Sequence, residues 1–152
     1  MIKVNVLSDE HSWSKRLVKK EKFFNKVCKF FPEKFKFNNK RVYLTVLLSN
    51  NKTIKDLNKK FRNKNKHTDI LSFPFEQKTK NQKEVYLGDI IISFNYMNKP
   101  RNLNKKEFEK KTMKIFIHGF LHLLGFDHIK NKDYKKIFNY EKKIFKSVEK
   151  LL

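Results

Sequence analysis

Hydrophobic and polar positions change their period several times along the first half of the chain. Residues 1–8 alternate apolar and polar side chains, as a half-buried strand does. Apolar side chains in 13–31 recur at helical spacing and stop at Pro32, which predicts one amphipathic helix. The run 42–48 is β-branched, aromatic and apolar, so it is predicted to be a largely buried strand.

The middle of the chain continues this mixture. Thr53 is expected to cap a short helix that runs through Phe61. Residues 69–75 predict a third strand, which Pro74 makes unsuited to the centre of a sheet. A polar loop at 78–84 separates it from a fourth strand at 86–94.

Two helices complete the pattern. The segment 105–124 is apolar almost all round from Met113 onward, which indicates a buried central helix, and 133–152 is amphipathic. Strands and helices are interspersed without strict alternation. We therefore expect an α/β fold of the α+β type, with a mixed sheet of about four strands packed by about five helices. Residues 1–152 are expected to form a single domain.

The predicted central helix carries candidate metal ligands. His118 and His122 are four residues apart, so a helix brings both imidazoles to one face. Gly125 can end that helix in a left-handed conformation and let the chain deliver His128 from a loop. Three imidazoles around one tetrahedral zinc ion leave a position for water, which is the pattern of catalytic sites.

Gly119 lies inside the histidine cluster, in a chain with three glycines. A glycine in the middle of a helix predicts that a neighbouring strand or a ligand approaches the backbone closely. The spacing also matches the long zinc-protease motif, but Gly119 stands where that motif has its catalytic glutamate. A peptidase is therefore disfavoured.

Charge and cysteine content narrow the class further. The net charge of +22 favours polyanionic partners, although part of it reflects a composition rich in lysine, asparagine, isoleucine and phenylalanine. Cys28 is alone, which excludes both an intrachain disulfide and a cysteine-based zinc site. Residues 1–6 lack the apolar core of a signal peptide, and 115–126 is too short to cross a bilayer, so we expect a cytoplasmic protein without membrane contacts.

Three segments resemble one known family. Residues 118–128 (HGFLHLLGFDH) look like the signature of the bacterial YbeY family of rRNA-maturation endoribonucleases. Residues 57–62 (LNKKFR), followed by 68–74 (TDILSFP), and 87–93 (LGDIIIS) are similar to two further blocks of that family, in the same order.

The resemblance implies a zinc-dependent, single-strand-specific endoribonuclease that acts in 16S rRNA 3′-end maturation and ribosome quality control. It implies one zinc ion per chain, held by His118, His122 and His128, and places Arg62 in the active-site cleft as the catalytic candidate. The implied partners are single-stranded rRNA, the small ribosomal subunit and its assembly factors, and no DNA is expected.

Two other functions stay open. One is a non-catalytic ribosome-assembly factor that binds RNA and has a structural zinc, and the other is a different zinc hydrolase. Asp127 has two equal interpretations, as a partner that orients an imidazole or as a turn residue. Asp69 and Asp89 also have competing interpretations, Asp69 as the start of a strand and Asp89 as a structural residue beside Gly88, and neither is assigned a catalytic role. His67 and His11 are interpreted as exposed. The basic residues around Phe61 predict either a wall for RNA or a solvated face; these are Lys59, Lys60, Arg62, Lys64 and Lys66.

Overall fold

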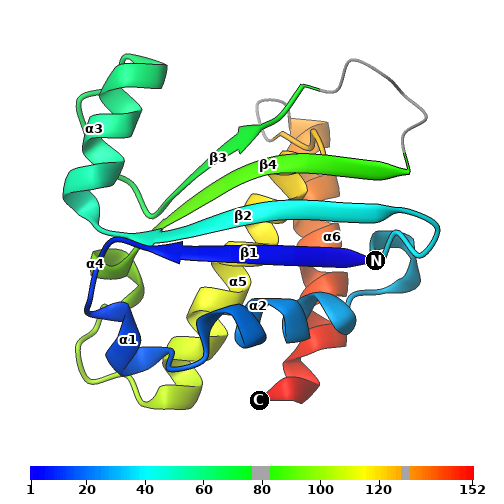
Figure 1. Cartoon of the computed structure of the whole chain (residues 1–152), viewed down its shortest axis with the longest axis horizontal. Helices are drawn as coiled ribbons and strands as arrows, with labels where there is room; N and C mark the ends of the chain where they lie inside the picture. The colour runs from blue at the N-terminus through cyan, green and yellow to red at the C-terminus, as the bar shows by residue number, and fades with distance from the viewer. Residues whose placement is uncertain (77–82, 128–130) are drawn as a thin grey trace.

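The computed structural model describes residues 1–76, 83–127 and 131–152. It contains a four-stranded sheet in the order β1-β2-β4-β3. Figure 1 shows α2, α5 and α6 on one side of this sheet, whereas α3 lies on the other side at one end. The expected fold, of α+β type with a mixed sheet, is confirmed.

The elements follow the sequence periods closely. The strands are β1 (Ile2–Ser8), β2 (Arg41–Ser49), β3 (Ile70–Pro74) and β4 (Glu84–Ser93). The α-helices are α1 (Trp13–Arg16), α2 (Lys20–Lys29), α3 (Asn51–Arg62), α4 (Phe94–Met97), α5 (Lys105–Leu123) and α6 (Asn131–Val148), and two short 3-10 helices occupy Glu33–Phe35 and Glu149–Leu151.

The sheet is mixed because its strands pair in two ways. β1 pairs in parallel with β2, and β2 with β4, whereas β3 runs antiparallel to β4 at the sheet edge. Pro74, the last residue of β3, lies at this edge, where its missing N–H is tolerated. Part of the loop predicted at 78–84 lies outside the described residues.

The prediction of one helix over 13–31 is wrong. The chain leaves helical geometry at Leu17, whose φ and ψ are −126° and 92°, and resumes it at Lys20. Leu17 is buried while Val18 is 78% exposed, so the break turns both short helices to place their apolar residues in the core. The apolar residues keep their helical spacing across residues 17–19, so the sequence period does not show that the helix breaks there.

The predicted start of α3 is also corrected. Asn50, not Thr53, caps this helix, since the Asn50 side-chain oxygen accepts a hydrogen bond of 2.9 Å from the Thr53 N–H. Thr53 lies one turn inside. A short helix, α4, directly after β4 was not predicted.

The central helix α5 is buried, as predicted, and supports the site. Phe108, Met113, Phe116 and Phe120 are fully buried between the sheet and the neighbouring helices. Burial of each such side chain contributes roughly 2–3 kcal/mol. The packing fixes the rotation of α5 about its axis, and with it the direction of the histidines.

Across residues 1–76, 83–127 and 131–152, no helix combines the length and apolar content that crossing a bilayer requires.

Candidate active site

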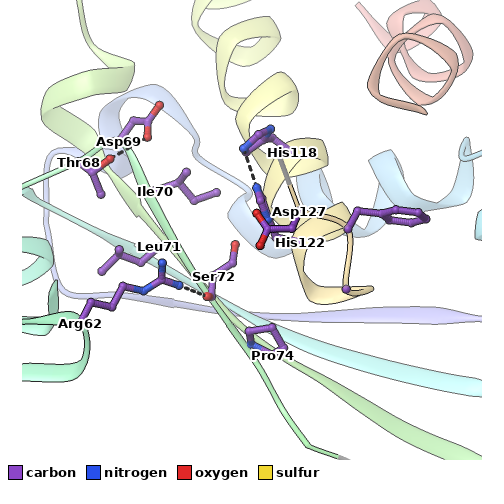
Figure 2. Close-up of a pocket in the computed structure, with 12 residues that line it drawn as sticks. Arg62, Thr68, Asp69, Ile70, Leu71, Ser72, Pro74, His118, His122 and Asp127 are labelled. Carbon is purple, nitrogen blue, oxygen red and sulfur yellow. Dashed lines mark hydrogen bonds between the residues drawn. The ribbon is translucent and has the colours of Figure 1, made fainter. Parts of the chain in front are cut away.

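A cleft of about 470 Å³ separates β3 from the carboxyl-terminal end of α5. Figure 2 shows His118 and His122 along one wall and Arg62 on the opposite wall, with Ser72 between them. The cleft therefore brings together two predicted metal ligands and the predicted catalytic arginine, although these come from distant parts of the sequence.

The two histidines converge because of their helical spacing. Their Nε2 atoms lie 3.0 Å apart, and the ring centroids are separated by 4.5 Å. Both residues belong to α5, whose opposite face is held in the core. The predicted alignment of His118 with His122 is confirmed.

Gly125 ends the helix as expected. Its φ is +95°, and its N–H donates to the His122 carbonyl at 3.0 Å while the Phe126 N–H donates to the Leu121 carbonyl at 3.1 Å. These two bonds form a Schellman motif, which satisfies carbonyls at the helix end. The chain turns there and places Asp127 on the cleft lining (Figure 2). His128, the third predicted ligand, lies outside the described residues.

Glu141 on α6 lies beside the histidines, although no sequence pattern predicts it there. Its carboxylate accepts a hydrogen bond from His118 Nδ1, and both side chains are about three-quarters buried. A proton held on Nδ1 leaves the Nε2 lone pair directed at the cleft. Glu141 is 23 residues from His118 in a lysine-rich amphipathic helix, so no local pattern marked it.

The donor atoms fit zinc in chemistry and spacing. With Zn–N bonds of about 2.05 Å in a tetrahedral site, two ligating nitrogens lie about 3.3 Å apart. The separation of 3.0 Å between the histidine Nε2 atoms is close to this value. A carboxylate on the remote ring nitrogen is the usual arrangement around a metal-ligating histidine. Within residues 1–76, 83–127 and 131–152, however, no three histidine, cysteine or acidic side chains form a complete metal-binding group.

Arg62 is the last residue of α3, on the wall opposite the histidines. Its Nη2 donates a hydrogen bond of 2.7 Å to the Ser72 carbonyl, and its guanidinium carbon lies 5.4 Å from the centre of the Phe73 ring. Asn63 follows in a left-handed conformation with φ of 55° and ends α3. β3 thus supports the arginine beside the cleft.

Gly119 faces the sheet rather than the cleft. A Cβ atom there would lie 2.6 Å from Ile70 Cδ1 and 3.2 Å from Ile90 Cγ2. The Ser72 hydroxyl also donates to the Gly119 carbonyl, at 3.3 Å. The predicted close approach is confirmed, and it comes from β3 and β4. A glutamate at this position would point into packed side chains instead of toward the cleft.

The other polar residues considered from the sequence lie at different places relative to the cleft. Asp69 lines the cleft, and its backbone carbonyl accepts a hydrogen bond from the Ser93 N–H at 2.9 Å. Asp89 is on the opposite face of the sheet, where its carboxylate accepts a bond from the Tyr86 hydroxyl. His67 is exposed, as expected, and bonds the Tyr96 hydroxyl at 2.9 Å.

A second hollow of about 410 Å³ adjoins the cleft and shares His118 and Asp69 with it. Lys111 lines this hollow and donates a hydrogen bond of 2.7 Å to the Tyr96 carbonyl. Partial burial lowers the pKa of the Lys111 ammonium group, and the Asp69 carboxylate partly offsets this shift. The surroundings of His118 thus include a cation.

The fold and the cleft define an α+β protein with paired histidines and an arginine on facing walls, an arrangement that suits hydrolysis of phosphate esters. Residues 7–149 match the family model described as Endoribonuclease YbeY. The chain therefore belongs to the YbeY family of endoribonucleases.

Individual relatives agree with this assignment. An endoribonuclease YbeY from Pelagibacter ubique is 58% identical over 149 residues, which are 98% of this chain and 97% of the relative. Another, from Sulfurihydrogenibium, is 34% identical and covers 94% of this chain and 91% of its own. A Thermotoga maritima protein with a solution structure gives a TM-score of 0.53 at 30% identity, over 97% of this chain and 89% of that one.

Proposed function

We propose that the chain is a single-domain, zinc-dependent endoribonuclease that cuts single-stranded rRNA in the cytoplasm. Its proposed task is 16S rRNA 3′-end maturation and ribosome quality control, with the small ribosomal subunit and its assembly factors as partners. The observation that carries the proposal is the convergence of His118 and His122 opposite Arg62, in one cleft of a chain that belongs to an endoribonuclease family.

His118, His122 and His128 would hold the metal, one zinc ion per chain. The chemistry supplied by bound zinc is polarisation of a phosphoryl oxygen and activation of water. Glu141 fixes the ring of His118 and keeps its proton on Nδ1, so that Nε2 is available as a ligand.

Arg62 binds the scissile phosphate across the cleft. Its planar guanidinium keeps its charge and offers two parallel N–H donors, which match two phosphate oxygens. The hydrogen bond to the Ser72 carbonyl uses one Nη2 donor and holds the group in place. Donors held in this way stabilise the charge that develops on the phosphate in the transition state.

A cleavage assay on a labelled single-stranded RNA tests the proposal. Zinc-loaded wild type is compared with His122→Ala purified identically, so that contaminating ribonuclease acts equally in both samples. We expect cleavage by wild type alone. Equal cleavage in both samples would refute the proposal that this chain cleaves RNA. RNA binding without cleavage, together with unfolding on chelation, favours the assembly factor with a structural zinc.

Arg62→Lys separates catalysis from binding in the same assay. Lysine keeps the positive charge but loses the planar pair of donors, so we expect kcat to fall about 100-fold with little change in RNA affinity. Arg101→Lys, at an exposed position outside the cleft, is the matched control. Product ends identify the nucleophile, since a 2′,3′-cyclic phosphate indicates attack by the substrate 2′-hydroxyl.

A further inference from the structure

The face of the sheet turned away from α2, α5 and α6 is largely open (Figure 1). α3 covers it at one end, where Ile54, Leu71 and Ile91 form a small separate core. The register places Asn5, Thr45, Asp89 and Phe73 in one row across the four strands of this face. α3 reaches Phe73 at one end of this row, whereas Asn5 and Asp89 are exposed.

Aromatic side chains border this open face. Phe61 at the end of α3 and Phe75 just beyond β3 are 60% and 58% exposed. The Phe61 ring lies 5.7 Å from that of Phe73, and the Phe75 ring lies 5.7 Å from that of Tyr86. Exposed rings held by neighbouring rings present flat surfaces on which nucleobases can stack.

A hollow of about 470 Å³ lies on this face beside the Phe61 and Phe73 rings. Phe61 and Phe73 line it on one side, and Leu7 and Thr45 line it across the sheet. Leu7 is 60% exposed, so the hollow is apolar and open to solvent. Its volume is in the range of small-ligand sites, which suits an unstacked base.

The open face continues into the cleft around the edge strand β3. Ser72 points to the cleft side, whereas the next residue, Phe73, points to the open face. Arg62 joins the two sides, because it lines the cleft while its guanidinium lies over the Phe73 ring. An RNA chain that passes around this edge at Arg62 can contact both surfaces.

Two lysines supply positive charge beside this face, and one carboxylate lines its hollow. Lys60 Nζ lies 5.3 Å from the centre of the Phe61 ring, and Lys3 is exposed in β1, where it pairs in register with Tyr43. The carboxylate of Asp89, which also lines the hollow, accepts the hydrogen bond from Tyr86. Cations beside exposed rings are the combination found in grooves that bind single-stranded nucleic acid.

We propose that single-stranded RNA binds across this open sheet face, with bases stacked on Phe61 and Phe75, and reaches the cleft around β3 past Arg62. This inference rests on the proposed ribonuclease function, for which it supplies a substrate-binding surface outside the cleft. Duplex RNA cannot use the surface in this way, since its bases are already stacked. This stacking platform, formed by Phe61 and Phe75, would therefore make the protein prefer single-stranded RNA over duplex RNA.

Tryptophan fluorescence tests the proposal on the full chain. The protein has one tryptophan, Trp13, which is fully buried and donates its N–H to the Ser49 carbonyl. Phe61→Trp and Phe75→Trp each add an exposed reporter, and a stacked base quenches indole emission. Phe30→Trp is the matched control, because Phe30 is 43% exposed at the end of α2, on the covered side of the sheet.

The ligand is a dye-labelled 2′-O-methyl RNA of about 12 nucleotides, within the span of single-strand sites. Gel electrophoresis checks that it stays intact, and dye anisotropy reports binding independently. We expect RNA to quench Phe61→Trp and Phe75→Trp but not Phe30→Trp. Phe61→Ala should weaken RNA affinity about 10-fold, and Phe30→Ala should leave it unchanged.

Two results would overturn the proposal in different ways. If wild type binds RNA but neither reporter is quenched and Phe61→Ala keeps full affinity, the platform is refuted while the ribonuclease function stands. The open face would then belong to a protein partner. If wild type binds no RNA even at low salt, the platform and the proposed function fail together.

Discussion

At the scale of single residues, the orientation of His118 is the most consequential contact in the cleft. An imidazole on a helix can rotate about two bonds and can carry its proton on either nitrogen. The hydrogen bond from Nδ1 to the Glu141 carboxylate removes both freedoms at once. The ordering entropy is therefore lost during folding, before the proposed zinc ion would bind.

Glu141→Gln should weaken zinc binding about 10-fold, at the low end of the range for such partners. The effect is small because the amide oxygen still accepts the Nδ1 proton, whereas the negative charge that raises the basicity of His118 is lost. Competition with a chromophoric zinc chelator measures the affinity, and thermal unfolding without zinc checks the fold.

Glu149→Gln removes the same charge from an exposed position near the end of the chain and is the control. Equal zinc affinities for the two variants would show that Glu141 does not act on the metal site.

Residue identities in the cleft could be predicted from the sequence where spacing alone places them. His118 and His122 align because four residues make about one helical turn, and Gly125 ends the helix because a positive φ suits glycine. Glu141 could not be predicted, since its approach depends on how α6 packs against α5. That packing is a tertiary property.

At the scale of elements, the edge strand β3 is the structural support of the candidate active site. It supplies the Ser72 carbonyl to Arg62 on one side and the Ser72 hydroxyl to the α5 backbone on the other. β3 can approach β4 closely because Gly88 has no side chain. A Cβ atom at Gly88 would lie 2.2 Å from the Phe73 carbonyl oxygen.

Gly88→Ala should destabilise the fold by about 3 kcal/mol and lower cleavage activity. A backbone oxygen cannot rotate away as a side chain can, and the φ of +135° is strained for alanine. β3 must therefore shift, and it carries the support of Arg62 with it. Urea denaturation measures the free energy of unfolding.

Gly125→Ala is the comparison, because its φ of +95° is also positive but no atom lies within 4 Å of the added Cβ. Its expected cost is about 1 kcal/mol, from backbone strain alone. If both variants lose the same stability, the close contact between β3 and β4 is not what requires Gly88.

Element types could be predicted from the sequence, but several boundaries could not. The helix expected over 13–31 breaks at Leu17, because two short helices with different axes can bury their apolar residues in the core. Asn50 replaces Thr53 as the cap of α3, since both residue types accept N-terminal hydrogen bonds and only the course of the chain after β2 decides between them.

At the scale of the whole molecule, the two faces of the sheet differ in how far helices cover them. The inner face is buried under α2, α5 and α6, and the outer face is open beside α3 (Figure 1). The alternation of polar and apolar residues in β1 predicted that one face of the sheet is polar. The sequence of β4 gave no such sign, because its Ile90, Ile91 and Ile92 are all apolar and Ile91 packs under α3 on the outer face. The position of the open face therefore follows from topology.

The net charge of +22 can act through local binding sites or as a general excess of lysine, and salt dependence separates the two. Lys60 and Lys64 flank Arg62 in the sequence and are exposed, so under the proposed RNA path the double change to glutamine should remove about two phosphate contacts. The slope of log affinity against log salt should then become shallower by about 1.4. Lys26 and Lys29 are exposed on α2, on the covered side of the sheet, and their double change to glutamine gives the same net charge of 22 − 2 = +20.

Fluorescence anisotropy across a salt series measures both slopes. Equal slopes for the two variants would mean that the charge acts as a diffuse field, without a defined path for RNA beside Arg62.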